Sequence, residues 1–104
     1  MITITRNKGF QMTFPNELTI SVQIGNMNYC VRKDTYTKYD AEMQMDIVKS
    51  PDAEIAIWDE KGDWFDFGHD TVKGWVPVTE VATWIERVAK ATSINDLNQY
   101  KNEA

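Results

Sequence analysis

Two stretches of alternating side chains near the N-terminus constrain the fold most. Between residues 18 and 24, apolar side chains occupy every second position and polar side chains fill the positions between them. A period of two puts the apolar side chains on one face of a half-buried strand. Residues 10–14 alternate in the same way, and residues 15–17 (Pro-Asn-Glu) between the two stretches are typical of a turn. The sequence therefore predicts a β-hairpin over residues 10–24, with Ile2 and Ile4 in a short strand before it.

Further strands are predicted after the break at Ser50-Pro51. Residues 53–58 are rich in β-formers, and residues 59–63 form a compact polar segment whose glycine suits a tight turn. Residues 64–67 alternate again and are predicted to form the return strand of a second hairpin. Residues 71–76 favour one more strand.

The C-terminal third of the sequence has the pattern of a helix. Pro77 is tolerated in a first helical turn, because the N–H that it lacks has no partner there. One apolar stripe follows at helical spacing and contains Val78, Val81, Trp84, Ile85 and Val88. Ser93 followed by Asp96 resembles a capping box and predicts a short second helix. Residues 101–104 are expected to fray.

These elements together predict an α+β fold. The expected architecture is an antiparallel sheet of about four to six strands, packed by one long amphipathic C-terminal helix, with a short terminal helix after it. A length of 104 residues suits a single domain over 1–104. Residues 32–49 have no clear period, although a helical turn over 41–48 fits their apolar spacing.

The expected compartment is the cytoplasm. Cys30 is the only cysteine, so no intrachain disulfide can form. The N-terminus has no apolar run of signal length, and no stretch approaches the roughly 18 apolar residues that span a bilayer. A membrane partner is therefore not expected.

Negative charge is concentrated in the middle third of the sequence. The net charge is −5, but residues 34–70 alone hold eleven acidic residues against three lysines, while residues 1–33 balance at +3. A field of that sign repels phosphates and attracts basic surfaces. Direct binding of nucleic acid needs a basic footprint and is not expected.

No catalytic, cofactor or metal motif is found in the sequence. Cys30 and His69 are the only soft ligands and lie 39 positions apart, whereas zinc takes four ligands at short paired spacings. The acidic turn at 59–66 lacks the register of a calcium loop. Neither a phosphate-binding glycine loop nor a nucleophile elbow occurs. An enzyme acting through Cys30 and His69, or through an acidic pair, is therefore the least favoured class.

Two of the four tryptophans have distinct expected roles. Trp84 lies on the apolar stripe of the predicted helix and is expected in the core. Trp58 is out of phase with Ile55 and Ile57, which places it on the opposite face of the sheet. An exposed tryptophan flanked by acids would suit a partner anchor.

Four segments resemble a group of small, uncharacterised accessory proteins encoded by bacteriophages. The segments run from Gly25 to Cys30, from Asp52 to Trp58, over Gly62-Asp63-Trp64, and from Asp70 to Pro77. The resemblance would cover residues 10 to about 91 and implies no activity. It implies a context, since small phage proteins outside the virion often bind and inhibit host proteins, including defence systems such as CRISPR.

The favoured hypothesis is a non-enzymatic phage-type interaction protein that inhibits a host protein, such as a nucleic-acid-handling defence complex. Its acidic surface would occupy a basic surface on the host protein by charge complementarity. The expected contact residues are Asp40, Glu42, Asp46, Trp58, Asp59, Glu60, Asp63, Trp64 and Asp66.

A small-molecule binder that sequesters a nucleotide signal is the alternative. Its tryptophans and tyrosines would stack on the base, and the phosphates would meet the N-terminal cations Arg6, Lys8, Arg32 and Lys33. The edge strands of a small sheet also leave a homodimer open.

Overall fold

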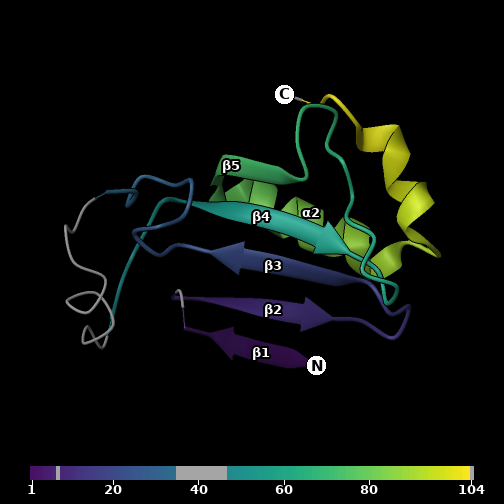
Figure 1. The fold of residues 1–104 in the computed structure, drawn as a ribbon, viewed down its shortest axis with the longest axis horizontal. Coiled ribbons are helices and arrows are strands. Elements are labelled where there is room, and N and C mark those ends of the chain that lie inside the picture. The colour runs from purple at the N-terminus through teal and green to yellow at the C-terminus, as the bar shows by residue number, and fades with distance from the viewer. Residues whose placement is uncertain (7, 35–46, 104) are drawn as a thin grey trace.

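The computed structural model describes residues 1–6, 8–34 and 47–103 (Figure 1). The predicted helical turn at 41–48 falls largely outside them. The described elements are β1 (Ile2–Thr5), β2 (Gly9–Thr13), β3 (Thr19–Gln23), β4 (Asp52–Trp58), β5 (Val72–Pro77), the helix α2 (Val78–Lys90) and the 3₁₀ helix η1 (Ile94–Tyr100).

The five strands form one antiparallel meander in the order β1-β2-β3-β4-β5. The hairpin predicted from residues 10–24 is confirmed, with Phe10 opposite Val22 and Met12 opposite Ile20. The next pair continues the same apolar rows, since Ile20 lies opposite Ile57. Alternation in the sequence therefore becomes one apolar face across neighbouring strands.

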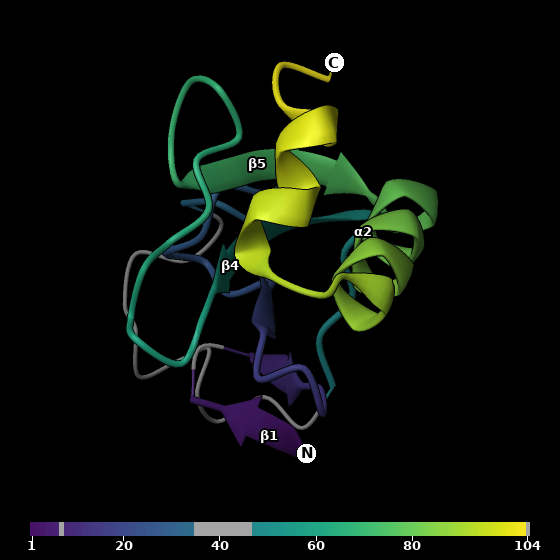
Figure 2. The same ribbon diagram turned by 90° about the vertical axis from the view of Figure 1, so that its right-hand side faces the viewer.

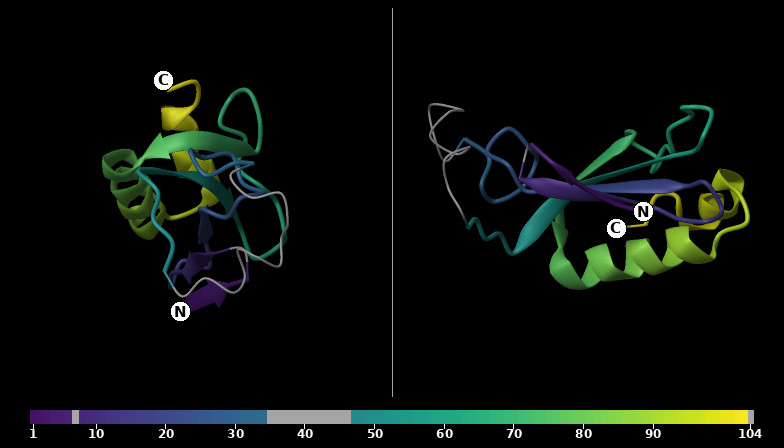
Figure 3. Two further views of the ribbon diagram at one scale, coloured as in Figure 1. Left: turned by 90° about the vertical axis from the view of Figure 1, so that its left-hand side faces the viewer. Right: turned by 90° about the horizontal axis from the view of Figure 1, so that it is seen from below.

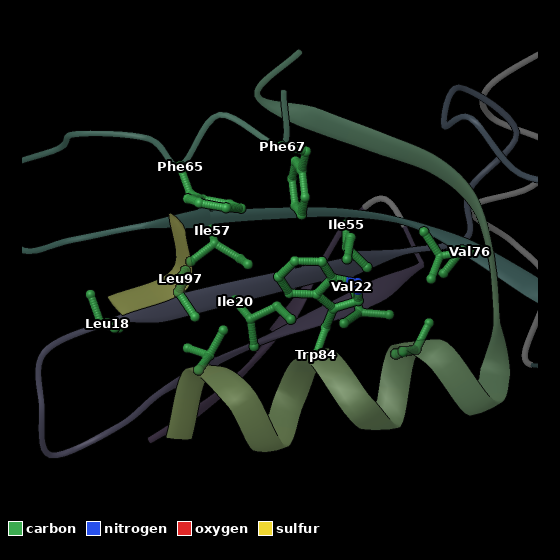
Figure 4. Packing of buried hydrophobic residues seen from close by; sticks show 13 residues of the cluster. Leu18, Ile20, Val22, Ile55, Ile57, Phe65, Phe67, Val76, Trp84 and Leu97 are labelled. Atoms are coloured by element: carbon green, nitrogen blue, oxygen red, sulfur yellow. The ribbon is translucent and has the colours of Figure 1, made fainter. Parts of the chain in front are cut away.

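Helix α2 and η1 lie on that apolar face, which confirms the predicted α+β class (Figures 2 and 3). Trp84 is 1% exposed and projects from α2 onto the sheet, where it meets side chains of β3 and β4 (Figure 4). Phe67 lies edge-on to Trp84 at 5.1 Å between ring centroids, and Tyr100 of η1 does the same at 6.0 Å. Aromatic rings from three segments thus close the core of this small domain.

The hairpin predicted from residues 53–67 is wrong in its second half. Residues 64–67 form no strand, and a single bridge links Trp58 to Trp64. The antiparallel partner of β4 on that side is β5. Phe65 and Phe67 are nevertheless buried at 3% and 2% exposure, because their alternation turns them into the core from an irregular loop.

Two details of the predicted helices also differ. Val81, Trp84 and Val88 are buried as expected, but Val78 is 67% exposed. Ser93 precedes η1 without a side-chain capping bond, and the carboxylate of Asp96 instead accepts the backbone N–H of Thr92 at 2.7 Å. The residue types fit a capping box, but their side chains form a different local bond.

Residues 101–103, part of the tail predicted to fray, make contacts with the rest of the chain. Asn102 donates its backbone N–H to the carbonyl of Phe67 at 2.8 Å. The carboxylate of Glu103 pairs with Arg87 at 3.0 Å, and that guanidinium also lies 3.9 Å from the ring centre of Tyr100. The tail therefore contacts α2, η1 and the loop before β5.

Asn16 joins the β2–β3 turn to the end of α2. Its amide nitrogen donates to the carbonyls of Val88 and Ala91 at 2.8 and 2.7 Å, and its oxygen accepts the N–H of Leu18 at 3.0 Å. These bonds satisfy carbonyls at a helix end that otherwise lack partners.

Replacing Asn16 with alanine is expected to lower the free energy of unfolding by about 1–3 kcal/mol, because two helix-end carbonyls lose their donor. Urea denaturation followed by far-UV circular dichroism measures the change. The control is Asn95→Ala, since Asn95 is exposed in η1. Equal effects of the two substitutions would contradict the assigned role of Asn16.

Candidate functional site: the acidic end of the sheet

The turn after β4 is built by one aspartate. The carboxylate of Asp59 accepts the backbone N–H groups of Lys61 and Asp63 at 2.9 and 3.0 Å. Gly62 has φ of 83°, a conformation that glycine adopts without steric cost. The carboxylate of Asp59 therefore stabilises the turn, whereas the side chains of Glu60 and Asp63 lie exposed on it.

Two tryptophans stack at the base of this turn. The rings of Trp58 and Trp64 lie 4.9 Å apart at an interplanar angle of 28°. Trp58 projects to the face opposite the buried Ile55 and Ile57, as its phase in the sequence predicts, and is half-buried, while Trp64 is 49% exposed. The backbone N–H of Phe65 donates to the carbonyl of Ile57 at 2.8 Å, and this bond fixes the loop that carries Trp64 beside the end of β4.

Several carboxylates belong to the loops at this end of the sheet, and we call this group the acidic end: Glu17, Asp59, Glu60, Asp63 and Asp66. Four of them line a hollow of about 410 Å³ between the β2–β3 turn, the loop after β4 and the start of η1. Asp63, Trp64 and Asp66 line a second hollow of about 270 Å³. Within the described residues none of the five forms an ion pair.

The structure brings together six of the nine predicted contact residues. Trp58, Asp59, Glu60, Asp63, Trp64 and Asp66 belong to one strand end and the loop that follows it. The other three, Asp40, Glu42 and Asp46, lie outside the described residues.

Some acidic residues of the middle third do not belong to the acidic end. The carboxylate of Glu54 accepts the backbone N–H of Tyr29 at 2.8 Å and the side-chain amide of Asn28 at 3.2 Å. Asp52 accepts the N–H of Val31 at 2.7 Å. These two carboxylates hold the loop after β3, so part of the negative charge is structural.

Cys30 and His69 occupy different loops. Cys30 follows β3 and is 1% exposed, with its thiol 3.7 Å from the carbonyl of Gly25. Burial raises the pKa of this thiol, which lowers the thiolate fraction at neutral pH. His69 is exposed between β4 and β5. Over the ranges that the structure describes, no cluster of three His, Cys, Asp or Glu residues could hold a metal ion.

Of the four N-terminal cations that the nucleotide alternative invokes, Arg32 and Lys33 lie in the loop after β3, where the amine of Lys33 is 5.7 Å from the ring centre of Tyr29. Arg32 is buried and donates to the carbonyl of Ile24 at 2.7 Å. Lys33 pairs with Asp34 at 3.0 Å, and this carboxylate raises the pKa of the lysine. In the described part of the chain, neither these two nor Arg6 and Lys8 line the hollows beside Trp58 and Trp64.

Sequence reasoning missed a groove of about 360 Å³, lined by polar and aromatic side chains, on the open face of the sheet. Its floor contains a hydrogen-bond chain in which Thr5 donates to Gln23 at 2.7 Å and Gln23 donates to Ser21 at 3.0 Å. Trp58 and Trp64 form one side. The alternate polar positions of β3 were the available signal, but the loops that enclose them are not encoded in any local period.

Comparison of the chain with protein-family models, with curated proteins and with solved structures finds no match. Among the described helices, none combines the length and apolar character needed to cross a membrane.

Proposed function

We propose that this chain is a non-enzymatic binding protein that docks its acidic end on a basic protein surface, with Trp64 as the apolar anchor. One observation carries the proposal: a half-exposed, stacked tryptophan lines a hollow together with Asp63 and Asp66, whose carboxylates form no ion pair within the described residues. Aromatic anchors surrounded by complementary charge are typical of binding hot spots.

The most specific form of the proposal is inhibition of a host machine that handles nucleic acid, in keeping with the resemblance to phage accessory proteins. Such a machine exposes a basic channel for the phosphate backbone. A rigid acidic loop that occupies the channel would compete with nucleic acid. The fixed geometry of the turn supports this, since Asp59 orders the loop before any partner is present.

Reversing two displayed charges is expected to abolish capture of the partner. In the double variant Glu60→Lys and Asp63→Lys, the changed carboxylates make no hydrogen bond that orders the turn, so the fold is retained. Tagged wild-type and variant chains are used as baits in bacterial lysate at about 50 mM salt, where exposed charges are weakly screened. The wild type is expected to retain one stoichiometric protein that the variant loses.

The matched control is Glu80→Lys with Glu86→Lys on α2, which changes the net charge equally at a different surface. Excess double-stranded DNA in the lysate is expected to displace the captured protein, because both compete for the same basic channel. Loss of capture in both double variants would show that net charge decides binding and would contradict a site at the acidic end.

A further inference from the structure

Helix α2 covers only part of the sheet. It packs against β3, β4 and β5, while β1 and β2 extend beyond it on the same side (Figures 2 and 3). The uncovered strands have an apolar floor made of Ile2, Ile4, Phe10 and Met12, which the register places on the face of the buried Ile20 and Val22. Ile2 is 67% exposed and Ile4 is 80% exposed.

The flank of α2 beside this floor is apolar as well. Val78, Ala82, Ile85 and Ala89 recur at intervals of four, three and four residues, so they form one stripe about a quarter turn from the core stripe. A hollow of about 280 Å³ lies where Val78, Ala82 and Ile85 meet Phe10, and Ser50 and Asp52 also line it. We call the floor on β1 and β2 and this wall on α2 the trough.

The eight residues that define the trough carry no charge, and the carboxylate of Asp52, which also lines the hollow, is already bound to the backbone N–H of Val31 and to the hydroxyl of Ser50. The chain has a net charge of −5, and the carboxylates of the acidic end belong to its turns and loops. A basic partner would therefore meet the acidic end, and the occupant of the trough must itself be apolar. Strand β1 is also an edge strand, and although it is short, it contains neither the proline nor the charged side chain that often prevents association at an edge.

We propose that a second copy of this chain fills the trough. In this arrangement the two β1–β2 floors pack face to face, and the β1 edge of each copy lies along α2 of the other. A helix and a second sheet both pack about 10 Å from a sheet, so the space beside α2 has the depth of one more sheet layer. The β1–β2 floor of one copy would thus fill the space above the floor of the other copy.

The area available agrees with a modest dimer. The exposed Ile2, Ile4 and Val78, together with the partly buried floor and wall, offer on the order of 600 Å² per copy. A pair then buries about 1,200 Å², which is the lower end of the range for specific interfaces. The small side chains of Ala82 and Ala89 leave room beside α2 for the edge strand of the other copy.

Sedimentation equilibrium over micromolar to millimolar protein tests the proposal. The wild type is expected to form a dimer that strengthens with salt, because screening weakens repulsion between two acidic chains. Capture of a basic partner weakens with salt, so the two associations are distinguishable. A wild type that stays monomeric throughout overturns the proposal.

Four single variants locate the interface. Ile4→Glu and Ala82→Lys are each expected to weaken dimerisation at least tenfold, because each buries an unpaired charge. Both positions are exposed in a single copy, so folding is retained, as urea denaturation verifies. The matched controls are Thr3→Glu, on the other face of β1, and Thr83→Lys, the neighbouring exposed position of α2; both are expected to dimerise normally.

Edge-to-edge pairing of β1 is the competing geometry, and in its symmetric register centred on Thr3 the two Thr3 side chains lie opposite each other. Loss of the dimer in Thr3→Glu would therefore overturn the trough arrangement. Mixing Ile4→Glu chains with Ala82→Lys chains is expected to restore a dimer, since the new charges meet across the β1–α2 contact. Failure of this mixture to associate would also overturn the arrangement.

Discussion

Replacing Trp84 with alanine is expected to lower the free energy of unfolding by about 3–5 kcal/mol. The ring is buried between the sheet and η1, with edge-on contacts to Phe67 and Tyr100. Its removal loses the transfer energy of a large apolar group and leaves a cavity that rigid strands cannot close. Because a domain of this size has a stability of about 5–15 kcal/mol, one side chain accounts for a large share of it.

Urea denaturation followed by circular dichroism measures this loss. Trp84→Phe provides a graded variant that keeps an aromatic ring in the core, so the comparison remains informative if the alanine variant does not fold. The control is Trp75→Ala, since Trp75 is 55% exposed and its removal opens no internal cavity. A cost below about 1 kcal/mol for Trp84→Ala would show that the core repacks around the gap.

Much of the core was predictable because it follows from periods that act over a few residues. The alternation over residues 10–24 determines which side chains of β2 and β3 face α2, and the register then aligns Ile20 with Ile57. The helical stripe gave Val81, Trp84 and Val88 in the same way. Each of these predictions depends on one element having one buried face.

The errors arise where a local period fits two structures. Phe65 and Phe67 alternate as they would in a strand, but a loop with Gly68 at φ of 114° turns the same rings inward. Val78 fits the edge of the helical stripe, but it is 67% exposed and lines the hollow beside Phe10. Sequence spacing gives the direction of a side chain on its element and does not give what lies opposite.

The acidic end was predictable only in part for the same reason. The density of acids after β4 and the phase of Trp58 are visible in the sequence. The approach of Glu17 from the β2–β3 turn is a tertiary contact, so it is not visible in the sequence. Nor could the sequence show that Asp52 and Glu54 bind backbone N–H groups of another loop.

The Trp64→Ala variant is expected to reduce the affinity for a captured partner at least tenfold, because truncated aromatic hot spots typically cost 2 kcal/mol or more. The matched control is Trp75→Ala, since Trp75 is equally large and similarly exposed but packs on Tyr29 at 5.6 Å, away from the acidic end. Biolayer interferometry with the purified partner measures both affinities, and Trp64→Phe is expected to restore part of the loss. Because Trp64 lies outside the core, its removal lowers the stability only slightly, which separates binding from folding. Equal affinities for the two alanine variants would mean that the partner does not contact the stacked tryptophans, and the acidic carboxylates alone would then have to explain the binding.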